Sequence, residues 1–223
     1  MVKTVALVLY ESQDFTFRDV QLICVHLRNK WRTSVDELQI ICFWNKASRE
    51  YNLGWVRIIP LDKKWPKWWS RMILYSPEVQ HLRPFLYLDL DTVIVNSIEN
   101  IFNLVTDETK YITLEDFGQP QRLATPVVWF PKQSAKIDSV WKAWTKQIEM
   151  PQGRMDYFLR NCTKQDLFWQ QITNTIIDFK PRRNDLLKNV NKDANLILFH
   201  GKPRIFEAAE TIKWVNDYTK LKG

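Results

Sequence analysis

The chain has 223 residues, 45% of them hydrophobic, with eleven Trp, twelve Phe and seven Tyr, which excludes a disordered protein and is typical of one α/β domain over 1–223. No run approaches the roughly 20 apolar residues of a membrane span, and the N-terminus lacks a signal-peptide pattern, so we expect a soluble, cytoplasmic protein. The three cysteines are odd in number and widely spaced, which favours buried thiols over disulfides or zinc ligands.

The net charge of +7 is compatible with nucleic acid, an anionic membrane or a phosphorylated small molecule as partner. Basic residues gather over 63–71 and 180–188, without the repeated basic and aromatic spacing that tracks a polynucleotide. The distribution therefore favours a phosphate-bearing small ligand over nucleic acid.

Apolar runs and helical stripes alternate along the chain. We expect strands over 5–10, 38–44, 56–61, 85–88, 111–114, 126–130 and 196–199. We expect helices after Ser12 or Asp14, from Trp65-Pro66 to about Tyr75, and over 98–104, 137–148, 167–172 and 205–215. This alternation predicts a largely parallel sheet, whose ligand crevice lies beyond the carboxyl ends of its strands.

Two carboxylates, Asp89 and Asp91, directly follow the apolar run 85–88. In an extended chain, side chains two residues apart point the same way and lie roughly 6 to 7 Å apart, so both can reach one cation. Two solvated acids at the end of a strand are the alternative, because the pattern is short.

His200 follows the run 196–199 in the same way, which predicts that it lies on the same rim of the sheet as Asp91. Two carboxylates and an imidazole suit a divalent cation, and the nitrogen ligand favours Mn²⁺ over Mg²⁺. Gly201 would let the backbone approach a ligand, and Lys202 would supply a positive charge for phosphate. A structural histidine is the alternative interpretation.

Four segments occur in order along the chain: Ser70-Arg71-Met72, FLYLDLDTVIV over 85–95, KQDL over 164–167, and HGKP over 200–203. Together they resemble the GT-A fold glycosyltransferases, and within them the retaining family 8, which includes glycogenin and bacterial galactosyltransferases. The sequence departs from the family pattern at Lys164 and over 124–127. The compact size and many Trp also resemble small glycosyltransferase domains of large algal viruses, for which the host cytoplasm would be the location.

The resemblance implies a GT-A fold and transfer of a sugar from a UDP-sugar to a hydroxyl of a glycan or glycoprotein acceptor, with retention of anomeric configuration. The roles it implies, together with the residue patterns, are a metal site for Mn²⁺ or Mg²⁺ at Asp89, Asp91 and His200, donor contacts at Tyr10, Arg71, Asp89, Gly201 and Lys202, and catalytic positions at Gln165 and Asp166.

Several alternatives stay open. Tyr10 either stacks on the nucleotide base or packs in the core, and Glu115 or Asp116 would be the general base of an inverting enzyme. The aromatic residues Trp65, Trp68 and Trp69 form either a sugar platform or part of the core. A carbohydrate-binding or nucleotide-binding module without catalysis and a nucleic-acid-binding protein are the competing functions.

Overall fold

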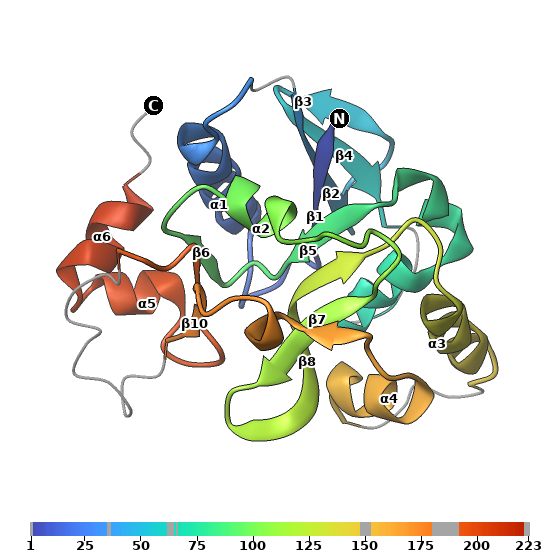
Figure 1. Cartoon of the computed structure of the whole chain (residues 1–223). Helices are drawn as coiled ribbons and strands as arrows, with labels where there is room; N and C mark the ends of the chain where they lie inside the picture. The colour runs from blue at the N-terminus through green and yellow to red at the C-terminus, as the bar shows by residue number, and fades with distance from the viewer. Residues whose placement is uncertain are drawn as a thin grey trace.

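The main feature of the fold is a mostly parallel sheet of eight strands (Figure 1). The structure is a computed structural model that describes residues 2–34, 37–61, 65, 67–147, 153–179 and 192–220. In spatial order the strands are β3 (Tyr51–Leu53), β4 (Val56–Pro60), β2 (Leu38–Trp44), β1 (Lys3–Leu9), β5 (Phe85–Leu88), β8 (Gln119–Phe130), β7 (Ile112–Asp116) and β9 (Leu167–Phe168). β4, β2, β1 and β5 run parallel, and β8 runs antiparallel between β5 and β7. The carboxyl ends of β1, β2, β4, β5 and β7 therefore meet at one edge.

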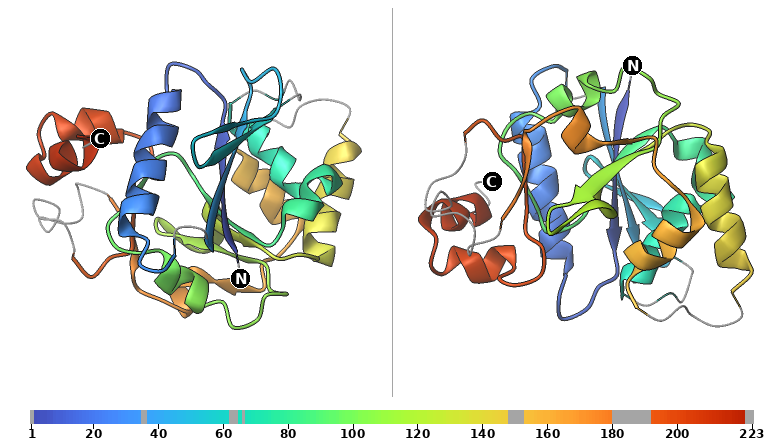
Figure 2. Two further views of the ribbon diagram at one scale, coloured as in Figure 1. Left: turned by 90° about the horizontal axis from the view of Figure 1, so that it is seen from above. Right: turned by 60° about the horizontal axis from the view of Figure 1, so that its bottom comes forward.

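Helices cover both faces of this sheet (Figure 2). They are α1 (Phe17–Lys30), α2 (Glu99–Asn103), α3 (Ala135–Thr145), α4 (Met155–Cys162), α5 (Ile205–Ala209), α6 (Lys213–Thr219) and the 3-10 helices η2 (Lys67–Tyr75), η3 (Pro77–Leu82) and η4 (Trp169–Gln171). α1 and α2 pack on one face, whereas η2, η3, α3 and α4 pack on the other. The sheet is thus the middle layer of three.

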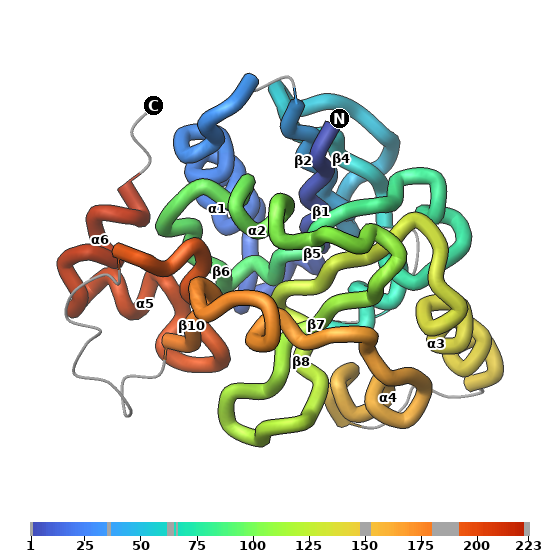
Figure 3. The backbone as a smooth tube through the Cα atoms, in the orientation of Figure 1, coloured from blue at the N-terminus to red at the C-terminus, as the bar shows by residue number. Residues whose placement is uncertain are grey.

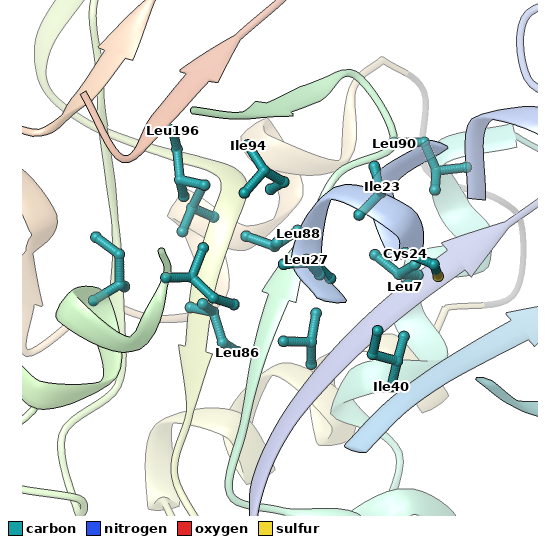
Figure 4. Close-up of a cluster of buried hydrophobic side chains, with 14 of the residues drawn as sticks. Leu7, Ile23, Cys24, Leu27, Ile40, Leu86, Leu88, Leu90, Ile94 and Leu196 are labelled. Atoms are coloured by element: carbon teal, nitrogen blue, oxygen red, sulfur yellow. The ribbon is translucent and has the colours of Figure 1, made fainter. Parts of the chain in front are cut away.

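The central strand β1 shows why the predicted strands are continuously apolar. Val5, Leu7 and Leu9 belong to the hydrophobic cluster on the α1 face, while Ala6 and Val8 belong to the cluster on the opposite face. Successive side chains of a strand point to opposite faces, so a strand covered on both sides needs apolar residues at every position. Figure 4 shows part of the cluster on the α1 face, with Leu7, Ile23, Leu27, Leu86 and Leu88 among its members.

A second, three-stranded sheet joins the C-terminal part of the chain to the segment after β5. β11 (Leu196–Leu198) lies between β10 (Ile176–Asp178), to which it is parallel, and β6 (Thr92–Ile94), to which it is antiparallel. The register pairs Leu198 with Thr92, and the amide of Phe199 donates to the carbonyl of Asp91 over 2.9 Å. The chain leaving β11 therefore starts beside Asp91, and Figure 3 shows the β6 segment close to β10.

Most predicted strands are confirmed, and β2 has the predicted bounds. Four predicted helices differ in the structure, and the C-terminal one is the last of them. α1 begins after Thr16, whose amide donates to Asp19 Oδ2 over 2.8 Å, so neither Ser12 nor Asp14 is the cap. The helix predicted to end at Tyr75 is of the 3-10 type, and the stripe over 167–172 forms β9 and the short η4.

The predicted C-terminal helix is two helices, α5 and α6, which bury Ile205, Ala208, Val215 and Tyr218 in one cluster. The hairpin strand β3 has no counterpart among the predicted elements. Pro66, Ile148 and the basic residues over 63–64 and 180–188 lie outside the described residues.

Cys24 and Cys42 are buried free thiols, and Cys162 is a free thiol that is half-buried. In the part of the chain that the structure describes, every helix is too short or too polar to cross a bilayer.

A buried carboxylate, Glu99, fixes the start of α2. Its side chain is 6% exposed and accepts hydrogen bonds from Thr33 N at 2.8 Å, Thr33 Oγ1 at 2.7 Å, Ser97 Oγ at 2.8 Å and Arg32 N at 3.1 Å. Burial raises the pKa of Glu99, but these hydrogen bonds to the charged form lower it more, so the pKa lies below the ordinary 4.5.

We expect Glu99→Gln to lower the free energy of unfolding by about 2 kcal/mol at neutral pH, because several hydrogen bonds to a charged group weaken together. The pKa of Glu99 is lower in the folded state than in the unfolded state, so its stabilisation is present above pH 4.5 and is lost as the pH falls through the folded value. Urea unfolding at about pH 7 and about pH 3.5 measures both effects. The exposed Glu108→Gln is the control, and equal losses for both variants would contradict the assignment.

Candidate functional site

A pocket of about 510 Å³ opens at the carboxyl edge of the main sheet. Its wall comes from the loop after β1, the start of η2, the end of β5, the start of α4 and the segment after β11. Five separate parts of the sequence thus supply side chains to one cavity. This is the location at which α/β sheets generally bind their ligands.

Asp89 is held by three contacts at the end of β5. Arg71 Nη1 donates to Asp89 Oδ2 over 3.0 Å, and the Tyr87 hydroxyl donates to Asp89 Oδ1 over 3.0 Å. The amide of Asp89 donates to the carbonyl of Pro126 on β8 over 2.8 Å. Burial lowers the pKa of Arg71, but the carboxylates of Asp89 and Asp156 and the hydroxyl of Tyr87 raise it more, so the guanidinium stays charged.

Asp91 is more deeply buried, with a side chain that is 8% exposed. Arg204 Nη1 donates to Asp91 Oδ2 over 2.9 Å, and the guanidinium carbon lies 4.6 Å from the ring centre of Phe15. Burial and the charge of Asp89 raise the pKa of Asp91, while Arg204 and Arg71 lower it, and the net direction is upward. Within the described residues, Asp91 Oδ1 is buried and has no hydrogen-bond partner.

His200 lines the same pocket as Asp91, because the pairing of β11 with β6 starts the segment after β11 beside Asp91. Its Nε2 is 3.9 Å from Asp178 Oδ1 at the end of β10, and its ring centre is 6.3 Å from that of Phe117. Gly201 follows with a φ of +73°, which is a conformation that favours glycine. The backbone therefore turns sharply after the imidazole, and Arg204 returns to the pocket.

The first turn of α4 supplies a carboxylate, Asp156, that the sequence patterns do not predict. Asp156 lines the pocket and accepts a hydrogen bond from Thr125 Oγ1 over 2.6 Å. Thr125 precedes Pro126, whose carbonyl accepts from the amide of Asp89, so β8 connects the two carboxylates. Acidic residues are common in the first turn of helices, and no sequence pattern beside Asp156 distinguishes it from such an acid.

Six of the predicted site residues line the pocket together: Tyr10, Arg71, Asp89, Asp91, His200 and Gly201. Lys202 is not among the lining residues, and its side chain is 83% exposed, with Nζ 3.5 Å from Glu207 Oε1. The cation that lines the pocket after β11 is instead Arg204.

Gln165 and Asp166, which the sequence predicts as catalytic positions, do not line the pocket. Asp166 directly precedes β9, which runs parallel to β7, so it lies at the amino edge of the sheet and not at the carboxyl edge. Its Oδ2 accepts from the amide of Tyr111 over 2.8 Å, and its Oδ1 pairs with Lys136. These contacts give Asp166 a structural environment.

The acids predicted as an alternative general base also lie outside the pocket lining. Asp116 Oδ1 accepts from the amides of Gly118, at 2.8 Å, and Gln119, at 3.2 Å, in the turn between β7 and β8. Glu115 Oε1 accepts from the amide of Gln121 over 2.5 Å. Both carboxylates therefore shape the β7–β8 hairpin.

The tryptophans near η2 divide between core and pocket. Trp69 is 4% exposed and stacks on Trp144 at 5.2 Å between ring centres, and Trp65 contacts the same Trp144 at 5.4 Å. Trp68 is 43% exposed and lines the pocket.

Comparison with known proteins identifies the fold. No family model matches the chain, and no curated protein matches it in sequence. The glycosyltransferase GlyE of Streptococcus pneumoniae TIGR4 superposes with a TM-score of 0.63 at 10% identity, over 99% of this chain and 60% of GlyE. The galactosyltransferase LgtC, solved with donor and acceptor sugar analogs, gives 0.60 at 13% identity, over 97% and 95% of the two chains. Mouse xyloside xylosyltransferase 1 gives 0.54 at 10% identity, over 90% and 98%.

At these identities the likeness establishes the fold alone, which is the GT-A fold of glycosyltransferases. The predicted fold class is confirmed. The chain spans about 60% of the length of GlyE.

We expect Arg204→Gln to lower the free energy of unfolding by about 2 to 3 kcal/mol, because it leaves the buried Asp91 carboxylate without its partner cation. Lys202 lies two residues before Arg204 and pairs with Glu207 in an exposed position. Lys202→Gln removes the same charge, and its free energy of unfolding should equal that of the wild type within experimental error. Urea unfolding of both variants measures the difference. Equal stability of the two variants would show that the contact between Arg204 and Asp91 contributes nothing.

Proposed function

We propose that this protein is a glycosyltransferase that moves a sugar from a UDP-sugar to a hydroxyl of a glycan or glycoprotein acceptor, with retention of anomeric configuration. The observation that carries the proposal is the pocket at the carboxyl edge, where Asp89, Asp91 and His200 meet Arg71 and Arg204. This mixture of carboxylates, imidazole and guanidinium groups suits a diphosphate bound together with a cation. The GT-A fold and the structure of LgtC with donor and acceptor sugar analogs support the same activity.

A divalent cation, Mn²⁺ or Mg²⁺, is part of the proposal. Asp91 Oδ1 is buried and has no hydrogen-bond partner within the described residues, which is the state expected of an oxygen that awaits a cation. Asp89, Asp91 and His200 would hold it, and the bound cation would offset negative charge on the leaving diphosphate. The three side chains are not preassembled, since the described residues contain no cluster of three or more metal-ligating side chains.

Arg71 and Arg204 are the cations of the chain that would bind the diphosphate. Both guanidinium groups line the pocket, and each already contacts one of the paired carboxylates. Guanidinium groups bind phosphate oxygens with two parallel hydrogen bonds, which orients the diphosphate as well as attracting it. The raised pKa of Arg71 keeps this group charged over the whole physiological range.

Asp156 would lie beside the reacting carbon. During transfer the bond from the anomeric carbon to the phosphate oxygen breaks, the acceptor oxygen bonds to that carbon, and the acceptor proton passes to the phosphate oxygen. Positive charge develops on the sugar ring, and a fixed carboxylate close to the ring stabilises it. The hydrogen bond from Thr125 at 2.6 Å orients Asp156 for this role.

We expect a thermal-shift screen of nucleotide sugars with Mn²⁺ to identify a stabilising UDP-sugar, because a ligand that binds the folded state stabilises it by about 2.7 kcal/mol at one hundred times its Kd.

Asp91→Ala should abolish Mn²⁺-dependent release of UDP, and His200→Ala should raise the Mn²⁺ concentration that this release requires. Full activity in both variants, or no shift with any nucleotide sugar, would refute the proposal.

The carboxylates of Asp156 and Asp166 give a matched pair of variants. We expect Asp156→Asn to lower kcat by about a hundredfold or more with little change in the KM for the donor, because it removes charge stabilisation in the transition state. Asp166→Asn should leave kcat close to wild type, because this residue lies at the opposite edge of the sheet. Steady-state UDP release measures both constants, and the reverse pattern would restore the sequence-based prediction.

A further inference from the structure

Trp68 is an exposed aromatic side chain at the pocket. Among the described residues the exposed large hydrophobic side chains are Val2, Leu53, Trp68 and Tyr157, and of these Trp68 lines the pocket. Its neighbour Trp69 is 4% exposed, whereas 43% of Trp68 is accessible. The start of η2 therefore turns the indole of Trp68 toward the cavity and the indole of Trp69 into the core.

The backbone at this point is held in a fixed geometry. Lys67 has a φ of +51°, which is uncommon for any residue other than glycine and marks a sharp change of chain direction. Arg71 Nε donates to the carbonyl of Trp68 over 3.3 Å, while Nη1 of the same guanidinium donates to Asp89. One side chain thus ties the position of Trp68 to the carboxylate at the end of β5.

Polar groups line the same cavity at the start of α4. Arg154 and Asp156 supply a guanidinium and a carboxylate there, and the Lys67 ammonium lies 5.8 Å from the Trp68 ring centre. A pyranose ring has an apolar face of C–H groups and a rim of hydroxyls, so it suits an aromatic face combined with nearby hydrogen-bonding groups. A small apolar ligand would leave the polar groups without partners, and a bare phosphate would make no use of the indole.

We infer that Trp68 is a stacking platform for a pyranose ring in this pocket, so that the substrate that contacts Trp68 is a saccharide. The inference rests on the proposed function and deepens it. The ring belongs either to a saccharide acceptor that enters from solvent or to the sugar of the donor, and the two sources share the same stacking chemistry.

Saturation-transfer NMR with methyl glucoside, galactoside, mannoside and xyloside tests the platform directly, in the presence of UDP and Mn²⁺. In the wild type we expect saturation to concentrate on the C–H groups of one ring face. Trp68→Ala should weaken pyranoside binding about tenfold, and Trp68→Phe should retain part of it, because a smaller aromatic face still stacks. Tyr157→Ala is the matched control, since Tyr157 is 51% exposed but does not line the pocket.

A second measurement separates the two sources of the ring. The affinities of Trp68→Ala for UDP and for the stabilising UDP-sugar are compared with those of the wild type. Loss of pyranoside binding with unchanged UDP-sugar affinity assigns the ring to the acceptor. A tenfold loss for the UDP-sugar, with UDP unaffected, assigns the ring to the donor.

The inference is overturned if Trp68→Ala binds pyranosides and UDP-sugar as tightly as the wild type, or if Tyr157→Ala loses as much affinity as Trp68→Ala. It is also overturned if the wild type binds neither ligand. Pyranoside binding that depends on Trp68, in a protein that binds no nucleotide sugar, would support the platform while rejecting the proposed transferase. Unchanged unfolding free energy of Trp68→Ala verifies that the exposed indole is not needed for folding.

Discussion

The pairing of β11 with β6 is the constraint on which the rest of the site depends. The hydrogen bond from the amide of Phe199 to the carbonyl of Asp91 starts the last segment of the pocket wall directly beside the acidic pair. His200 and Arg204 reach the cavity because the chain leaves β11 at this point. A shift of β11 by one residue against β6 would turn the side chains of β11 to the opposite face and displace the segment that carries the imidazole. The chemistry of the pocket therefore rests on a short antiparallel ladder outside the main sheet.

The second constraint is electrostatic. Asp89 and Asp91 carry like charges close together, and each is matched by a guanidinium from a different element, Arg71 from η2 and Arg204 from the N-terminus of α5. Burial and the charge of Asp89 raise the pKa of Asp91, and Arg204 and Arg71 lower it again without reversing the net upward direction. The arginines therefore offset part of the negative charge of the acidic pair, and in the proposed reaction they would neutralise a diphosphate. Both tasks need a permanently charged, planar group, which explains why arginine serves here and the exposed Lys202 does not.

The sequence predicts the layers of this fold well because its strands are buried on both faces. Each strand of the parallel core is a run of apolar residues with a definite length, and a covered strand has few other ways to satisfy its side chains. Short elements were predicted less well. β9 and η4 occupy a segment whose apolar residues have helical spacing, because pairing of Leu167 with Ile112 on β7 determines the local structure there. These two residues are far apart in the sequence, so the local spacing of apolar residues does not predict their pairing.

The dependence on contacts between distant parts of the sequence also explains which residues of the candidate site could be predicted. Asp89, Asp91 and His200 directly follow buried strands, and the carboxyl end of such a strand is a place that local pattern identifies. Asp156 and Asp166 are both acids beside short elements, and local pattern does not distinguish them. The difference arises from tertiary structure: Thr125 on β8 holds Asp156 at the carboxyl edge, whereas the pairing of β9 with β7 holds Asp166 at the amino edge. Strand direction therefore decides which of the two acids lines the pocket, because direction decides which edge of the sheet a residue reaches.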